Sequence, residues 1–137
     1  MRIKLDTPLS FSEIAHCIAC RPPRENRIAE YISTDTRELS FGDVFISLRG
    51  KNYDGESFLE EAKKKGAFTV STVKELADFH VSDTEDSLLK LSKHYKETAL
   101  PNLKLTVAIT GSVGKTTTKE IVCALLKEKY MVQLQLL

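Results

Sequence analysis

The sequence predicts an α/β fold with a largely parallel sheet, followed by the first strand, loop and helix of a second α/β domain. Short runs of β-branched and aromatic residues alternate with stretches whose apolar residues recur every three or four positions, which is the pattern of strands joined by helices. A polar break with a proline at 100–102 then precedes a new apolar run. The expected domains are therefore residues 1–100 and 101–137.

Strands are expected wherever a short apolar run is bounded by turn residues. The segments that meet this description are 27–33, 43–48, 67–71, a short one at 78–81, and 105–109. The last of these, Leu-Thr-Val-Ala-Ile, is the most apolar in the chain. It is expected to be the first strand of the second domain.

Two helices are predicted from their end signals. Ser10 and Glu13 have the spacing of a capping box, which predicts a short helix that ends before Pro22. Asp54 and the following glycine open a second helix, and Gly66 supplies its C-terminal stop. The apolar residues of this second helix are Phe58, Leu59 and Ala62.

Two further helices follow. Asp83 is the expected cap of a helix that runs to about Thr98, before Pro101. The last helix is expected from Thr116 to about Lys129. Helical periodicity predicts that Leu88, Leu89, Leu91 and Tyr95 of the first and Ile121, Val122, Leu125 and Leu126 of the second point inward.

Composition excludes several classes of partner. The chain of 137 residues is 42% hydrophobic and 28% charged, and its net charge of +1 leaves no electrostatic footprint for nucleic acid. No apolar run approaches the ~20 residues that span a bilayer, so no membrane insertion is expected. The first residues lack the apolar stretch of a secretory signal. The sequence therefore predicts a cytoplasmic protein with reduced thiols.

Cys17 and Cys20 form a C-x-x-C pair beside His16. Paired thiolates at this spacing occur in zinc and redox sites, but a structural zinc ion needs about four ligands. The third cysteine, Cys123, is far along the chain. We therefore interpret the pair as small apolar residues at the end of a short helix.

The strongest functional signal is the stretch T-G-S-V-G-K-T-T-T at 110–118. Glycines let the backbone approach a phosphate, and the start of the following helix offers free N–H groups to the anion. Lys115 supplies charge for the β- and γ-phosphates of ATP, and the Thr116 hydroxyl is a ligand for Mg²⁺. The predicted ATP-binding residues are Gly111, Ser112, Val113, Gly114, Lys115, Thr116 and Thr117, with Lys115 also the predicted catalytic residue.

This loop departs from the general P-loop consensus sequence, which has a glycine at the position of Ile109. The bland alternative is a glycine-rich turn that binds nothing. A turn alone does not call for a lysine followed by threonine at the start of a helix. An ATPase also needs a carboxylate for the metal, usually after a later strand. The chain stops about twenty residues beyond the loop, so we expect no efficient ATP turnover by it alone.

The loop and an earlier stretch together resemble the Mur ligases, the ATP-dependent amide-forming enzymes of peptidoglycan precursor synthesis. The earlier stretch comprises I-S-T-D-T-R at 32–37, G-D-V-F-I-S-L-R-G at 42–50, and Asp54, Gly55 and Phe58. It is similar to the N-terminal uridine-nucleotide domain of that family. Residues 112–113 and Lys119 look most like the member that adds D-alanyl-D-alanine. The third-residue-adding relative more often has Thr-Asn in the loop.

The resemblance implies a mechanism and a set of partners. ATP would phosphorylate the terminal carboxylate of UDP-N-acetylmuramoyl-tripeptide, and the amine of D-alanyl-D-alanine would attack the acyl phosphate. ATP and Mg²⁺ are the implied cofactors. By their positions in the motif, the residues implied to contact the uridine substrate are Thr34, Thr36, Lys51, Asn52 and Tyr53.

Plainer interpretations remain open beside this one. Asp35 and Arg37 are equally explained as a structural ion pair, Asp54 as a helix cap, and Tyr53 as a cover for the core edge. For the chain as a whole, the alternatives are the third-residue-adding ligase, a uridine-nucleotide-binding module without catalysis, and an unrelated P-loop kinase or GTPase. The motifs before the loop count against the last.

Overall fold

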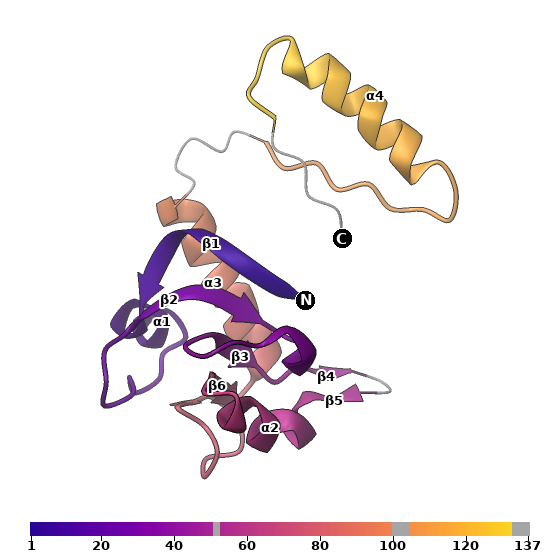
Figure 1. The fold of residues 1–137 in the computed structure, drawn as a ribbon. Helices are drawn as coiled ribbons and strands as arrows, with labels where there is room; N and C mark the ends of the chain where they lie inside the picture. Colours follow the sequence, from indigo (N-terminus) through magenta and orange to yellow (C-terminus); the bar gives the residue numbers. More distant parts are fainter. Residues whose placement is uncertain (51–52, 100–104, 133–137) are drawn as a thin grey trace. The chain divides into compact units, whose positions relative to one another are not determined.

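A computed structural model describes residues 1–50, 53–99 and 105–132 (Figure 1). The chain divides into two compact units, Met1–Asn102 and Leu103–Leu137. The first unit holds a five-stranded sheet with helices on both faces, and the second holds one long helix. None of the helices in the described ranges is long and apolar enough to cross a membrane.

The sheet of the first unit has the strand order β1-β2-β3-β6-β7. Its strands are β1 (Arg2–Ser10), β2 (Ile28–Ser33), β3 (Val44–Ile46), β6 (Phe68–Ser71) and β7 (Phe79–His80). The last four run parallel, and β1 pairs antiparallel with β2 at one edge. The predicted strands at 27–33, 43–48, 67–71 and 78–81 are thus confirmed, with somewhat shorter bounds.

Strand β1 was not predicted from the sequence. Ile3 and Leu5 alternate with polar residues as a strand requires, but the pairing shifts register between Lys4 and Leu9, which interrupts the period of two. Within this irregular stretch the backbone N–H of Thr7 donates to the Tyr95 hydroxyl at 3.0 Å. The N–H is therefore satisfied by a side chain instead of by a neighbouring strand.

The predicted strand at 105–109 is wrong in this structure. These residues have no regular secondary structure, and Leu105 and Val107 are 61% and 49% exposed. An isolated extended segment cannot satisfy its backbone groups, because a strand exists only through its pairing with another. The described part of the second unit provides no other strand for it.

The helices of the first unit begin where the sequence signals predicted. Ser10 and Glu13 form the capping box of α1 (Phe11–Cys17), and the hydrogen bond from Ser10 lowers the pKa of Glu13. Asp54 caps the short 3-10 helix η2 (Gly55–Phe58), which continues into α2 (Leu59–Lys64).

The third helix, α3 (Thr84–Ala99), is also capped as predicted. Asp83 accepts hydrogen bonds from the backbone of Glu85 and Asp86 at 2.8 and 3.0 Å. After α2, Gly66 adopts φ +75°, the left-handed conformation that ends a helix without cost only at glycine.

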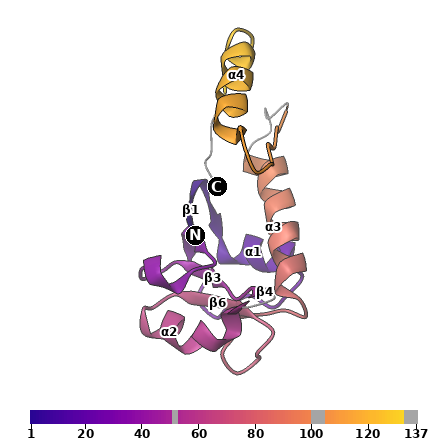
Figure 2. The ribbon, with the colours of Figure 1, turned by 90° about the vertical axis from the view of Figure 1, so that its right-hand side faces the viewer.

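Alternation along the strands builds a separate core on each face of the sheet. Helix α2 lies on one side of the sheet, and α1 and α3 lie on the other (Figure 2). Val44 and Ile46 face the side of α1 and α3, whereas Phe45 between them packs with Leu59 and Ala62 of α2. All five are essentially inaccessible to solvent. Residues that point to opposite faces are thereby held in one rigid element.

The second unit contains α4 (Lys115–Lys127), as the sequence predicted. Its predicted inward face is partly wrong, because Ile121 and Leu125 are 56% and 67% exposed and the buried side chain is Cys123. Leu89 of α3 was also predicted inward and is 70% exposed. Helical periodicity defines an apolar stripe, but whether the stripe is covered depends on the neighbouring elements.

Candidate functional site

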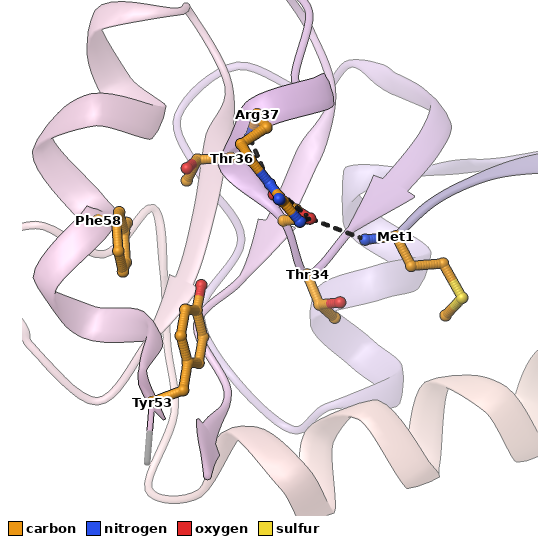
Figure 3. Close-up of a pocket in the computed structure, with 7 residues that line it drawn as sticks. Met1, Thr34, Thr36, Arg37, Tyr53 and Phe58 are labelled. Carbon is orange, nitrogen blue, oxygen red and sulfur yellow. Dashed lines mark hydrogen bonds and ion pairs between the residues drawn. The ribbon is translucent and has the colours of Figure 1, made fainter.

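A cavity of about 440 Å³ lies where β2 ends (Figure 3). The carboxyl ends of parallel strands are the common location of ligand sites in α/β proteins. Here the loop after β2 and the segment around η2 provide the walls. The lining residues are Met1, Thr34, Asp35, Thr36, Arg37, Tyr53 and Phe58.

The first wall is fixed by an ion pair between Asp35 and Arg37. The guanidinium approaches the carboxylate with Nε–Oδ1 at 2.9 Å and Nη2–Oδ2 at 2.5 Å, and the Arg37 backbone N–H also donates to Oδ1. This fork holds the pKa of Asp35 far below its usual range and raises that of Arg37. The predicted structural pairing is therefore present, and it lies within the cavity wall.

The two threonines of this wall differ in exposure. Thr34 is half-buried, whereas Thr36 is only 4% exposed and opens the 3-10 turn η1 (Thr36–Glu38). Ser33 precedes them at the end of β2, where its hydroxyl accepts from the Asp35 backbone N–H at 3.1 Å. The wall is consequently anchored in the sheet.

The second wall is a pair of aromatic rings. Tyr53 and Phe58 stack with centroids 5.5 Å apart and planes 14° from parallel (Figure 3). Tyr53 belongs to β5 (Tyr53–Asp54), which pairs with β4 (Arg49–Gly50). The side chain is 43% exposed, and partial burial raises the pKa of its hydroxyl. One aromatic wall thus remains accessible from the cavity.

Gly55 holds the aromatic wall close to the sheet. Its N–H donates to the Leu48 carbonyl at 2.8 Å, and a Cβ at this position would lie 2.5 Å from the same oxygen. Only glycine permits this approach of two backbone segments. The Asp-Gly pair in the sequence therefore serves packing as well as capping.

Three residues predicted to contact the uridine substrate, Thr34, Thr36 and Tyr53, line this one cavity. The other two, Lys51 and Asn52, lie outside the described residues. Sequence reasoning did not assign Met1 or Phe58 to the site. No local pattern connects Met1, which precedes the unpredicted strand β1, to a loop more than thirty positions away.

The predicted phosphate loop forms a turn at the start of α4. Gly111 and Gly114 adopt φ +148° and +78°, conformations that favour glycine. The Lys115 ammonium donates to the Gly111 carbonyl at 2.5 Å, closing the loop. The Thr118 backbone N–H donates to the Gly114 carbonyl at 2.9 Å, which is the first hydrogen bond of the helix. The backbone N–H groups of residues 115–117 come before it and have no partner within the helix.

These features fit a phosphate group. The loop and residues 115–118 are exposed, and a Cβ placed on Gly114 would meet no atom within 4 Å. An anion could therefore reach the unpaired N–H groups from solvent. The Thr116 hydroxyl could supply one oxygen ligand to Mg²⁺, which takes most of its other ligands from phosphates and water.

The C-x-x-C pair lies at the end of α1 and just after it, and both cysteines pack against the core. Cys17 and Cys20 are half-buried thiols, and burial raises the pKa of both. Within residues 1–50, 53–99 and 105–132, no group of three or more His, Cys, Asp and Glu is placed to hold a metal ion. A raised pKa disfavours the thiolate that metal binding requires.

Comparison with known proteins shows that the chain is a homologue of the Mur ligases over most of its length. More particularly, its similarity is to UDP-N-acetylmuramoyl-tripeptide–D-alanyl-D-alanine ligases, or MurF. The Synechocystis enzyme is 38% identical over 71% of this chain, and the Bacillus subtilis enzyme is 32% identical over 92%. No protein-family model matches the chain.

A Clostridium perfringens UDP-N-acetylmuramoyl-L-alanyl-D-glutamate–2,6-diaminopimelate ligase is 34% identical over 76% of the chain. These three curated relatives are much longer, and the chain spans only 22–28% of their length.

Solved structures agree in fold. MurF from Acinetobacter baumannii superposes over 93% of the chain, which covers 29% of that protein, with a TM-score of 0.70 at 27% identity. MurF from Thermotoga maritima in complex with ADP matches 72% of the chain, which covers 23% of that protein, with a TM-score of 0.53 at 40% identity. The mixed α/β architecture with a parallel sheet is therefore shared with these structures.

Proposed function

We propose that this chain provides the uridine-nucleotide site and the ATP phosphate loop of a ligase that joins D-alanyl-D-alanine to UDP-N-acetylmuramoyl-tripeptide. Residues 1–100 would form the nucleotide-binding domain, and residues 101–137 would begin the ATP-binding domain. The observation that carries the proposal is the cavity at the end of β2, because three residues chosen from the sequence motif alone line it. The relatives' activity supplies the chemistry.

The cavity offers the groups that a uridine nucleotide needs. The hydroxyls of Thr34 and Thr36 can donate to and accept from the uracil edge and ribose. The Tyr53 ring presents an aromatic surface on which a base can stack. Arg37 is 86% exposed, so one side of its guanidinium remains available for negative charge while the other holds Asp35.

The loop would bind the phosphates of ATP. Lys115 would exchange its hydrogen bond to Gly111 for a phosphate oxygen, and the N–H groups of residues 115–117 would donate to the same anion. The ADP complex of the Thermotoga maritima relative supports nucleotide binding in this family. Bound Mg²⁺ would neutralise phosphate charge during transfer to the peptide carboxylate, with Thr116 as one ligand. An ATPase also needs a metal carboxylate, usually after a later strand, and the described part of the second unit has no strand, so we expect the chain to be inactive alone.

The third-residue-adding ligase is the second candidate, and the Clostridium perfringens relative favours it. The two enzymes act on different nucleotide peptides, a UDP-N-acetylmuramoyl-tripeptide and UDP-N-acetylmuramoyl-L-alanyl-D-glutamate. Preferential binding of the dipeptide nucleotide over the tripeptide nucleotide would favour this alternative.

The test is a calorimetric titration of UDP-N-acetylmuramoyl-tripeptide into the chain. We expect saturable binding that Tyr53→Ala weakens about tenfold, because base stacking on an aromatic ring contributes roughly 1–3 kcal/mol. Thr36→Ala should also weaken it. Tyr130→Ala is the matched control, since Tyr130 is 41% exposed and lies in the other unit. Absence of binding by the folded chain, or equal effects of both tyrosine variants, would contradict the uridine-site assignment.

A further inference from the structure

The cavity wall around Thr36 is held by a residue of another element. Lys65 follows the last residue of α2, and its ammonium donates to the Thr36 carbonyl at 2.7 Å, across 29 positions of sequence. The same ammonium lies 3.2 Å from the Glu61 carboxylate. The Lys65 side chain is 34% exposed, so its ammonium group keeps some contact with solvent while it donates to the Thr36 carbonyl of the wall.

The hydrogen bond from Lys65 strengthens a weakly held turn at Thr36. Its carbonyl also accepts the Leu39 N–H at 3.3 Å, the bond that closes η1. That bond is long, whereas a hydrogen bond from an ammonium is short and roughly twice as strong as a neutral one. Ser33 and the Asp35–Arg37 fork hold the wall from the β2 side, and Lys65 holds it from the end of α2.

We propose that Lys65 is a positioning residue of the uridine-nucleotide site, acting through the backbone of Thr36. This inference rests on the proposed function, because it concerns the same cavity. Lys65 is not among the residues that line the cavity, so its effect on the ligand is indirect. It fixes the orientation of the turn that places Thr34, Thr36 and Arg37 in the wall.

The experiment measures the affinity of the full chain for UDP-N-acetylmuramoyl-tripeptide by calorimetry. Lys65→Met retains the aliphatic stem and removes the donor, and it should weaken binding about tenfold, the range expected for one charge-assisted hydrogen bond. Lys65→Arg restores a cationic donor and should recover most of the affinity. Lys64→Met is the matched control, because Lys64 is the neighbouring residue and is exposed at the end of α2, and it should bind within about twofold of the wild type.

Thermal melting separates positioning from general destabilisation. Lys65→Met and Lys65→Arg should melt within a few degrees of each other, yet differ in affinity. Wild-type affinity in a folded Lys65→Met chain, or equal losses in the Met and Arg variants, would overturn the role of Lys65 and leave the proposed function intact. If the folded wild-type chain binds no nucleotide, the proposed function itself is overturned, and the role of Lys65 with it.

Discussion

The cavity at the end of β2 and the loop before α4 are built in opposite ways. The cavity combines segments more than fifty positions apart, and its groups are fixed by an ion pair, a stacked ring pair and a lysine that follows α2. The loop uses one continuous stretch, 111–118, with exposed side chains and two glycines. A site made of consecutive residues depends on local backbone conformation, whereas an assembled site depends on the core beneath it.

The largest effect should come from removing that core. Leu59 of α2 is fully buried in the core against which the cavity residue Phe58 packs, so Leu59→Ala should destabilise the first unit by about 2–5 kcal/mol. Leu125→Ala is the matched change on α4, where the side chain is 67% exposed, and should cost less than about 0.5 kcal/mol. Urea unfolding of the full chain measures both. Similar costs for the two leucines would show that the apolar face of α4 is covered in solution.

A smaller effect is expected from a backbone change in the loop. Gly114 has φ +78°, so Gly114→Ala should cost about 1–2 kcal/mol in local strain and lower the affinity for Mg·ATP about tenfold. Gly42 is a close control, because it has φ +88° and, like Gly114, no atom within 4 Å of an added Cβ. Gly42→Ala should carry a similar strain and leave ATP affinity unchanged, as measured by calorimetry. Equal losses of ATP affinity in both variants would show that the effect is not specific to the loop, and would contradict its role in nucleotide binding.

The same contrast explains what could be predicted from sequence. The loop could be predicted as one stretch, because a lysine and threonines at a helix start are informative without any neighbour, and its binding of phosphate stays a prediction. In the described residues, four of the five strands of the main sheet and all four α-helices were also predicted, since each has its own period and end signals. Strands β4 and β5 were not predicted. The strand at 105–109 and the buried faces of Leu89, Ile121 and Leu125 were wrong, because pairing and burial are properties of neighbours.

The cavity was predictable only in part. Thr34, Thr36 and Tyr53 came from a family motif, and their proximity was visible only once the strands were ordered. Phe58 was expected as an ordinary apolar helix residue, and no sequence motif singled out Lys65. Neither the ring stack nor the bond to the Thr36 carbonyl leaves a periodic signal in the sequence.

The smallest effect concerns the electrostatics of the cavity wall. The Arg37 fork depresses the pKa of Asp35 in the folded chain below the value of about 3.9 found in unfolded chains. A depressed carboxyl pKa contributes stability that is present above pH ~4 and is lost as the pH falls through the folded value. Stability should therefore decline less steeply below pH 4 in Asp35→Asn than in the wild type.

The difference should be modest, because Arg37 is exposed and solvent screens the pair. Urea unfolding at pH 5 and pH 3 measures it, and Asp6→Asn is the control, since Asp6 is an exposed carboxylate on β1. Parallel pH profiles for wild type and Asp35→Asn would mean that the fork does not persist in solution. In that case Arg37 would be free to meet the nucleotide with its whole guanidinium, and the cavity would be less preorganised than the loop.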